Sequence, residues 1–309
     1  MGEIVSRLTA RKGTNEYERE NEMIQTGLQN KVVLITGANH GIGAATAKAF
    51  AAEGAAVLMN YLRLTPMRRY ERDEEKLDIY DSMRAKSADE VVQAIRDPGG
   101  RAEAVEADLS DVATIPMLFD RAEALFGPVD ILVNNADYCK QDTFIPTGRL
   151  GPADVAPDGY PTLSITAETH DRHFAVNSRA VALMMAEYAR RRIEQGKHGG
   201  RIINISTDGA PGFAGEISYG ASKYAVESYT RAAAVELGRY GITANIVSPG
   251  PIQTGWIRPE LEQQIIVETP LGRVGRPEDV ADVIVFLASE QGRWVSGQMI
   301  SASGGRRMF

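Results

Sequence analysis

Short apolar runs of strand length alternate with helix-forming stretches along most of this chain. The first run is Lys31–Thr36, and an alanine-rich stretch that favours a helix follows it up to Glu53. A run that is apolar at nearly every position predicts a strand buried on both faces, as in parallel sheets covered by helices. The alternation therefore predicts an α/β fold, with one doubly wound domain and a parallel sheet of about seven strands. The further expected strands are Ala55–Asn60, Ala102–Ala107, Val129–Asn134, Arg201–Ser206, Thr243–Val247 and one near Gln298–Ser301.

Two less regular segments interrupt this pattern. Residues 64–86 are rich in Arg, Asp and Glu, and we interpret them as a solvated surface insertion, with contact to another subunit as the alternative. Residues 138–166 hold several Pro and Gly, and their place after the fourth strand predicts a substrate-facing or a disordered loop. The polar residues 1–28 predict a flexible extension or a subunit-contact arm, which leaves 29–309 as the folded domain. The expected helices are Val91–Arg96, Ile115–Phe126, Phe174–Glu194, residues 218–238 and Pro277–Ser289.

Composition excludes several classes of protein. The chain of 309 residues is 43% hydrophobic and 24% charged, which suits a packed core. Its net charge of −7 argues against a general nucleic-acid-binding protein, and no apolar run approaches the ~18 residues of a membrane span. The single cysteine, Cys139, excludes an internal disulfide and suits a reducing compartment, so we expect a cytoplasmic protein. His170 and His173 have no neighbouring residues that would complete a metal site, and we expect none.

A glycine-bearing turn joins the first strand to the helix that follows it. Glycines stand at Gly37, Gly41 and Gly43. Glycine lets the backbone turn tightly and approach a pyrophosphate, and a helix N-terminus offers unpaired N–H groups to the phosphates. The spacing Gly-x-x-x-Gly-x-Gly differs from the G-x-G-x-x-G pattern. Its place after the first strand nevertheless predicts nucleotide binding.

The residues that end the second strand indicate which dinucleotide is bound. An Asp or Glu there would accept a hydrogen bond from the ribose 2′-hydroxyl, whereas a 2′-phosphate requires neutral or cationic neighbours. The chain has Asn60-Tyr61-Leu62-Arg63 at this point, and His40 lies in the glycine turn. We therefore expect NADP, with NAD as the alternative. Arg63 is the candidate partner of the phosphate, unless it faces solvent.

Tyr219 and Lys223 lie four residues apart in a helix-forming stretch, which places them on one helix face. A free tyrosine titrates near pH ~10. An ammonium about 4 Å away, at an effective dielectric of about 20, contributes about 4 kcal/mol, or about three pKa units. We therefore predict that Lys223 lowers the pKa of Tyr219, so that it can exchange a proton with a substrate oxygen. For an isolated pair, a partly buried tyrosine beside a solvated lysine is the alternative.

In this order the motifs resemble those of the short-chain dehydrogenase/reductase family, from about Lys31 to Gly305. The turn Thr36–Gly43 matches the family's Thr-Gly-x-x-x-Gly-x-Gly, and Asn134–Asp137 corresponds to its Asn-Asn-Ala-Gly after the fourth strand. The family's Tyr-x-x-x-Lys falls on Tyr219 and Lys223. The other matches are Asp108-Leu109 after the third strand, where the family's acid contacts adenine, and Pro249-Gly250 after the sixth.

The resemblance implies a Rossmann-type domain that binds a nicotinamide cofactor and a small carbonyl or alcohol substrate. Tyr219 is then the general acid/base, while Lys223 lowers its pKa and holds the ribose hydroxyls of the nicotinamide. Asn177 corresponds to the family's catalytic Asn, which helps hold a water between the two. The catalytic hydroxyl falls on Thr207 by strand register or on Ser206 by its distance from Tyr219, and we favour Thr207. The expected cofactor-binding residues are Gly37, Asn39, His40, Gly41, Ile42, Gly43, Tyr61, Arg63, Asp108, Leu109, Asn135, Ala136, Tyr219, Lys223, Pro249, Gly250, Ile252 and Thr254.

Asp137 departs from the family pattern, because it replaces the glycine of Asn-Asn-Ala-Gly close to where the nicotinamide is expected. The added side chain either alters activity or is accommodated in an unusual backbone conformation. A second open point is the segment from Gly255 to Pro270. We expect it to cover the substrate with an apolar wall, although its apolar residues would equally suit core or subunit contacts.

The resemblance does not choose a substrate or a direction. Family members of similar layout reduce 3-oxoacyl thioesters or oxidise small sugars and alcohols. Tetramers and dimers are common among them, so we expect a homo-oligomer, with a homotetramer first. Two other functions use the same fold: a nucleotide-binding sensor or subunit partner, and an epimerase or dehydratase.

Overall fold

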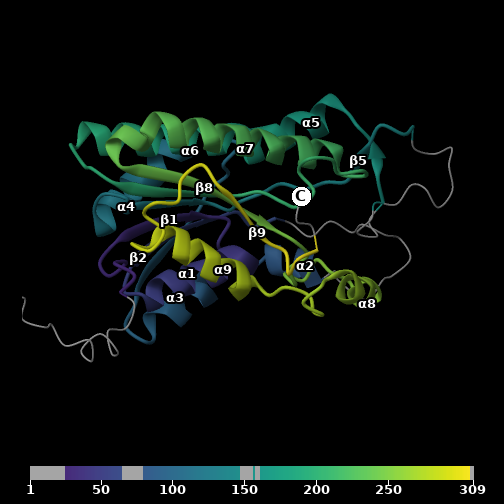
Figure 1. Cartoon of the computed structure of the whole chain (residues 1–309), viewed down its shortest axis with the longest axis horizontal. Helices are drawn as coiled ribbons and strands as arrows, with labels where there is room; N and C mark the ends of the chain where they lie inside the picture. The colour runs from purple at the N-terminus through teal and green to yellow at the C-terminus, as the bar shows by residue number, and fades with distance from the viewer. Residues whose placement is uncertain (1–24, 65–78, 147–155, 157–160, 307–309) are drawn as a thin grey trace, which may run out of the picture.

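In the described part of the chain, seven parallel strands form one sheet in the order β3-β2-β1-β4-β7-β8-β9 (Figure 1). This computed structural model describes residues 25–64, 79–146, 156 and 161–306. Strands β1, β2, β4 and β8 are buried along their whole length, as expected for apolar runs covered on both faces. The strands are β1 (Val32–Thr36), β2 (Ala56–Tyr61), β3 (Arg101–Glu106), β4 (Ile131–Asn134), β7 (Gly200–Ile205), β8 (Ile242–Pro249) and β9 (Met299–Ala302).

Helices cover both faces of the sheet (Figure 1). Helices α1, α3 and α9 lie on one face, where Val33 of β1 packs in the same core as Phe50 of α1. Helices α4, α6 and α7 lie on the other, where Leu34 of β1 shares a core with Phe119 of α4. Successive side chains of a strand point to opposite faces, so each buried strand contributes to both cores. The helices are α1 (Gly41–Ala52), α3 (Asp89–Arg96), α4 (Thr114–Phe126), α6 (Val181–Glu194), α7 (Ile217–Leu237) and α9 (Pro277–Ala288).

The strand order reverses between β1 and β4, which lie side by side at the centre of the sheet. Ligands of open α/β sheets bind outside the carboxyl ends of the strands at such a reversal. Several short elements gather at one end of the sheet (Figure 1). These are α2 (Ile79–Arg84), α8 (Pro259–Glu268) and a two-stranded parallel sheet of β5 (Asp142–Thr143) and β6 (Leu163–Ser164).

The predicted fold class, its seven strands and its helices are confirmed, with one helix altered. The helix expected over Phe174–Glu194 begins earlier, with α5 (Ala167–His173), and runs into α6 through a π-helical segment, η3 (Phe174–Ala180). A short 3₁₀ turn, η4 (Gly238–Tyr240), ends the α7 region. Single π-helical turns occur mostly at functional sites, and η3 contains Asn177.

Two predictions about the periphery are wrong in part. Of residues 1–28, most lie outside the described residues, but Leu28 is 1% exposed and belongs to the core, so the domain begins before residue 29. Residues 65–78 of the expected surface insertion also lie outside the described residues. Its end is not a solvated excursion, because α2 buries Asp81 and places Tyr80 and Arg84 on a pocket.

Candidate active site

A cavity of about 390 Å³ opens at the carboxyl ends of the central strands. It lies where the strand order reverses, and segments after β1, β2, β3, β4, β7 and β8 all contribute to its lining. Most residues predicted to bind the cofactor or to act in catalysis meet there. Those that line it are Gly37, Asn39, His40, Gly41, Ile42, Tyr61, Asp108, Leu109, Asn135, Ala136, Ser206, Thr207, Tyr219, Lys223, Pro249, Gly250, Ile252 and Thr254.

The glycine turn lies against the end of β4. Gly37 has a φ of +66°, and a Cβ there would lie 2.6 Å from the Cα of Ala136. Asn135 clamps the turn, since its Nδ2 donates to the carbonyls of Thr36 and Gly37 at 3.0 and 2.8 Å. The N–H groups of Asn135 and Ala136 donate to Thr36 Oγ1, both at 3.0 Å. The geometry of the turn is thus held by the residues that follow β4, Asn135 and Ala136.

The N-terminus of α1 faces the cavity next to this turn. No side chain among the described residues caps it, and its first turn carries no acid. Gly41 and Ile42 line the cavity, and Thr254 approaches Gly41 so closely that a Cβ on Gly41 would lie 3.0 Å from its methyl group. Free N–H groups, a positive helix end and a cradle that a side chain would fill match the requirements of a pyrophosphate. The chain therefore fits a dinucleotide.

The residues at the end of β2 and just after it separate into two groups. Tyr61 lines the cavity, and Asn60 uses its side chain to bind the end of β3, donating to the carbonyl of Ala107 at 2.9 Å. Arg63 lies outside the lining and pairs with Glu106, with its Nε 3.0 and 2.9 Å from the two carboxylate oxygens. The Arg63 side chain is 55% exposed, so it faces solvent, the alternative left open by the sequence, and it does not line the cavity. His40 remains beside the cavity, where burial lowers its pKa to about 4, so it is neutral at pH 7.

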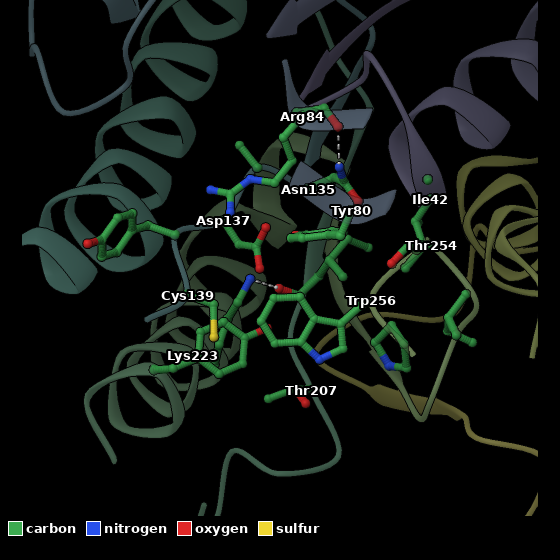
Figure 2. A pocket seen from close by; sticks show the side chains of 18 of the residues that line it. Ile42, Tyr80, Arg84, Asn135, Asp137, Cys139, Thr207, Lys223, Thr254 and Trp256 are labelled. Carbon is green, nitrogen blue, oxygen red and sulfur yellow. Dashed lines mark hydrogen bonds between the residues drawn. The ribbon is translucent and has the colours of Figure 1, made fainter. Parts of the chain in front are cut away.

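Tyr219 and Lys223 project from α7 into the cavity, as predicted. The Lys223 ammonium lies 5.7 Å from the centroid of the Tyr219 ring and donates to the carbonyl of Ile205 at 3.0 Å. Figure 2 shows the Lys223 side chain beside Asp137 and Cys139, which follow β4. The pair thus lies at the junction of α7, the end of β7 and the loop after β4.

The prediction that Lys223 lowers the pKa of Tyr219 is wrong for this arrangement. Burial raises the pKa of Tyr219 well above its usual value, and the Asp137 and Cys139 side chains raise it further. Burial also lowers the pKa of Lys223. The prediction assumed a cation about 4 Å from a solvated phenol. Here the loss of water around the phenol outweighs the attraction of the cation.

The two candidate hydroxyl groups have different environments. Ser206 is buried, and its Oγ donates to the Glu227 carboxylate of α7 at 2.9 Å. Thr207 keeps part of its surface exposed, and its Oγ1 accepts a hydrogen bond from the N–H of Gly209 at 3.3 Å. Because Thr207 Oγ1 acts as an acceptor there, its hydroxyl proton remains available to a ligand. The Ser206 hydroxyl, by contrast, already donates its proton to Glu227.

Asn177 lies behind the cavity rather than in its lining. It is fully buried in η3, where its Oδ1 accepts from the N–H of Tyr138 at 2.7 Å and its Nδ2 donates to the Tyr138 carbonyl at 2.8 Å. Its Nδ2 also donates to Ser222 Oγ at 2.9 Å, one residue before Lys223. Asn177 therefore ties the loop after β4 to the catalytic helix. Gly43 likewise packs behind the lining, against Gly37 and Asn135.

Several cavity residues were missed by the sequence analysis. Tyr80 of α2 packs edge-to-face against His40, at 5.6 Å between ring centroids, and against Trp256, at 4.8 Å. It therefore bridges the glycine turn and the expected substrate-covering segment, of which Trp256, Ile257, Leu261 and Ile265 line the cavity. No local pattern marks Tyr80 within its charged segment. Other lining residues outside the predicted set are Arg84, Tyr138, Arg172, Val176, Asp208, Phe213, Glu216, Gln264, Glu268 and Arg306.

Two features are absent from the described residues. No helix in that part of the chain has the length and apolarity needed to cross a bilayer. Within the same residues, no group of three or more His, Cys, Asp or Glu is arranged to hold a metal ion. His173, one of the two histidines weighed as ligands, is fully buried and accepts a hydrogen bond from the N–H of Lys140 at 3.1 Å.

Comparison with known proteins identifies the family. The model described as enoyl-(acyl carrier protein) reductase matches residues 71–307. A chloroplastic NADPH-dependent aldehyde reductase-like protein of Arabidopsis thaliana is 36% identical over an alignment of 288 residues, which covers 90% of this chain and 94% of the relative. The chain belongs to the short-chain dehydrogenase/reductase family. The resemblance seen in the sequence is thereby confirmed.

Solved structures agree with this family. A short-chain dehydrogenase/reductase from Serratia marcescens has a TM-score of 0.72 at 31% identity and covers 91% of this chain and 99% of its own. A blue fluorescent protein from a metagenomic library, in complex with NADPH, has a TM-score of 0.70 at 31% identity and the same coverage. As a member of the short-chain dehydrogenase/reductase family, the chain is an oxidoreductase that depends on NADP or, alternatively, NAD.

Proposed function

We propose that this enzyme moves a hydride between NADP and a carbonyl/alcohol pair, with Tyr219 as the general acid/base. The observation that carries the proposal is the meeting of Tyr219, Lys223 and Thr207 in one cavity with the glycine turn and the free N-terminus of α1. Lone Tyr-x-x-x-Lys spacings are common, but here the turn that leads into α1 and the segment from Thr207 to Lys223 lie far apart in the sequence. Their convergence supports catalysis rather than chance proximity.

The nicotinamide supplies or accepts the hydride when it is bound. Tyr219, which is protonated at neutral pH because its pKa is raised, donates its proton to the carbonyl oxygen as negative charge develops there. Thr207 donates a second hydrogen bond to the same oxygen. Lys223, held by the Ile205 carbonyl, returns a proton to Tyr219 after the transfer. Asn177 positions the loop that carries Asp137 and Cys139.

Thr207 is the proposed hydroxyl because Ser206 is engaged elsewhere. Thr207→Val removes the hydroxyl and keeps the shape, so we expect turnover to fall by about 10²-fold while cofactor binding persists. Ser206→Ala is the matched variant, and it should reduce turnover much less, through a local change at Glu227. Equal losses in both variants, or the larger loss in Ser206→Ala, would reverse the assignment.

The preference for NADP rests on the absence of an acidic residue at the end of β2, where the adenosine ribose is expected to bind. The cavity-lining residues at the end of β2 and just after it, Asn60, Tyr61, Leu62 and Leu64, include no acid to repel a 2′-phosphate. Arg63 does not contribute, because Glu106 holds it. The names of the Arabidopsis relative and of the NADPH complex also favour NADP. Titration with NADPH and NADH, followed by cofactor fluorescence, should give the tighter binding for NADPH.

A panel of aldehydes and ketones tests the activity itself. With NADPH, at least one carbonyl compound should be reduced with loss of one reduced cofactor per alcohol formed. Product formation without net cofactor oxidation would instead support an epimerase or dehydratase. Tight cofactor binding without turnover on any carbonyl would support a sensor or subunit partner.

We also propose a homo-oligomer, with a homotetramer first. The support is apolar surface on α7, where Val235 is 83% exposed and Tyr224 and Tyr229 are also exposed. Light scattering coupled to size-exclusion chromatography measures the mass directly, and the mass of a single chain would refute this proposal.

A further inference from the structure

The Asp137 carboxylate lies inside the cavity beside the catalytic pair. Asp137 lines the cavity and is exposed to it. Figure 2 shows its side chain between Lys223 on one side and Arg84 of α2 on the other. Asn30 is the sole non-glycine residue of the described chain with a positive φ, so Asp137 has an ordinary backbone conformation. The idea that this position adopts an unusual conformation is therefore wrong, and the added carboxylate side chain is what distinguishes it from glycine.

Negative or potentially negative groups dominate the surroundings of the Tyr219 hydroxyl. Burial is the largest influence on its pKa, and every neighbouring group of note acts in the same upward direction. Of the cations nearby, the Lys223 ammonium lies 5.7 Å from the centroid of the Tyr219 ring and is bound to the Ile205 carbonyl, while Arg84 lies across Asp137. His40 and His173, which also feel Asp137, are neutral at pH 7 because burial lowers their pKa values. The groups facing Tyr219 are Asp137 and Cys139 after β4, Glu216 at the start of α7 and Tyr80 of α2.

We propose that Asp137 biases the Tyr219–Lys223 pair electrostatically toward its proton-donating form, so that this enzyme acts as a carbonyl reductase at neutral pH and oxidises alcohols only under alkaline conditions. A carboxylate stabilises phenol over phenolate and ammonium over amine in its vicinity. Reduction needs the phenol, and oxidation needs the phenolate. The inference rests on the proposed function of Tyr219.

The reaction balances in each direction. In reduction the carbonyl carbon gains a hydride from the reduced nicotinamide, and the carbonyl oxygen gains the Tyr219 proton, which gives the alcohol and oxidised nicotinamide. In oxidation the phenolate takes the hydroxyl proton while the carbon loses its hydride. Asp137 does not change which bonds form and break or where the hydride goes. It changes the pH at which Tyr219 becomes available as a base.

The pH profile of alcohol oxidation tests this bias. In Asp137→Asn, the inflection of kcat/KM should move to lower pH, and oxidation at pH 7 should rise several-fold while reduction at pH 7 does not. Asp137→Gly restores the residue found in the family motif and should move the inflection in the same direction. Arg84→Gln removes the cation across from Asp137 and should move it to higher pH. Asp282→Asn, an exposed acid of α9, is the charge-matched control and should leave it in place.

A second measurement needs no cofactor or substrate. The alkaline absorbance of tyrosinate, taken as the difference between a protein and its Tyr219→Phe counterpart, isolates the titration of Tyr219. Asp137→Asn should bring that titration to lower pH. An unchanged titration and an unchanged inflection in both Asp137 variants would overturn the inference. If Tyr219→Phe itself keeps the inflection, the proposed function fails instead, so the two failures are distinguishable.

Discussion

A single methyl group at Gly43 should disrupt the contact that forms the cofactor site. A Cβ on Gly43 would lie 2.2 Å from the carbonyl oxygen of Gly37 and 2.7 Å from Asn135 Nδ2. Alanine favours a helix over glycine by about 1 kcal/mol. Overpacking costs about 1–3 kcal/mol, and here backbone must move, so the upper value applies. Separating Asn135 from Gly37 also loses a hydrogen bond worth about 1 kcal/mol. We therefore expect Gly43→Ala to lower the free energy of unfolding by about 3 kcal/mol.

The matched control is Gly238→Ala. Gly238 follows α7 in a right-handed conformation, with φ −55° and ψ −38°, and no heavy atom of the described residues lies within 4 Å of its added Cβ. The same substitution should therefore stabilise by about 0.5–1 kcal/mol. Denaturant unfolding measures both changes, and NADPH fluorescence measures binding, which Gly43→Ala should abolish. The reasoning is refuted if Gly43→Ala unfolds at the wild-type denaturant concentration and still binds NADPH.

Three further predictions concern residues around the cavity. His40 has a pKa of about 4 in the folded protein and about 6.5 when unfolded, so the unfolded chain binds its proton first and stability falls as the pH drops from 6.5 to 4. These values correspond to about 3 kcal/mol at pH 4, and His40→Asn should remove that part of the decline when Tm is plotted against pH. Asn177→Ala leaves the buried backbone of Tyr138 unpaired and should cost about 2–4 kcal/mol in denaturant unfolding, whereas a loss below about 1 kcal/mol would contradict its clamping role. Arg63→Ala should change the Kd for NADPH by less than about threefold, because Glu106 already holds the guanidinium. A larger loss of NADPH affinity would show that Arg63 binds the 2′-phosphate after all.

Local patterns predicted most of the fold and the core of the site. Strand β1 is apolar at every position but its last, Thr36, and is buried throughout, so its sequence alone identified it. The glycine turn and the Tyr219–Lys223 pair were recognisable because each depends on spacing within one segment. Their meeting in one cavity followed from the parallel topology, since the carboxyl ends of the strands share one edge.

What the sequence could not predict depends on contacts between distant segments. Tyr80 reaches the cavity because α2 folds back onto Trp256, and nothing in residues 64–86 signals this. The partner of Arg63 depends on the register of β2 and β3, which places Tyr61 opposite Glu106. The pKa of Tyr219 depends on how completely the surrounding side chains exclude water, which spacing along a helix does not reveal.

Tyr219→Phe tests the central claim most directly. The substitution removes only the hydroxyl, and the glycine turn, the end of β4 and Lys223 remain to hold the cofactor. The account predicts that the Kd for NADPH stays within a few-fold of wild type while kcat for carbonyl reduction falls by about 10²–10⁴-fold. Turnover at the wild-type rate, with NADPH still bound, would contradict the assignment of Tyr219 as the proton donor.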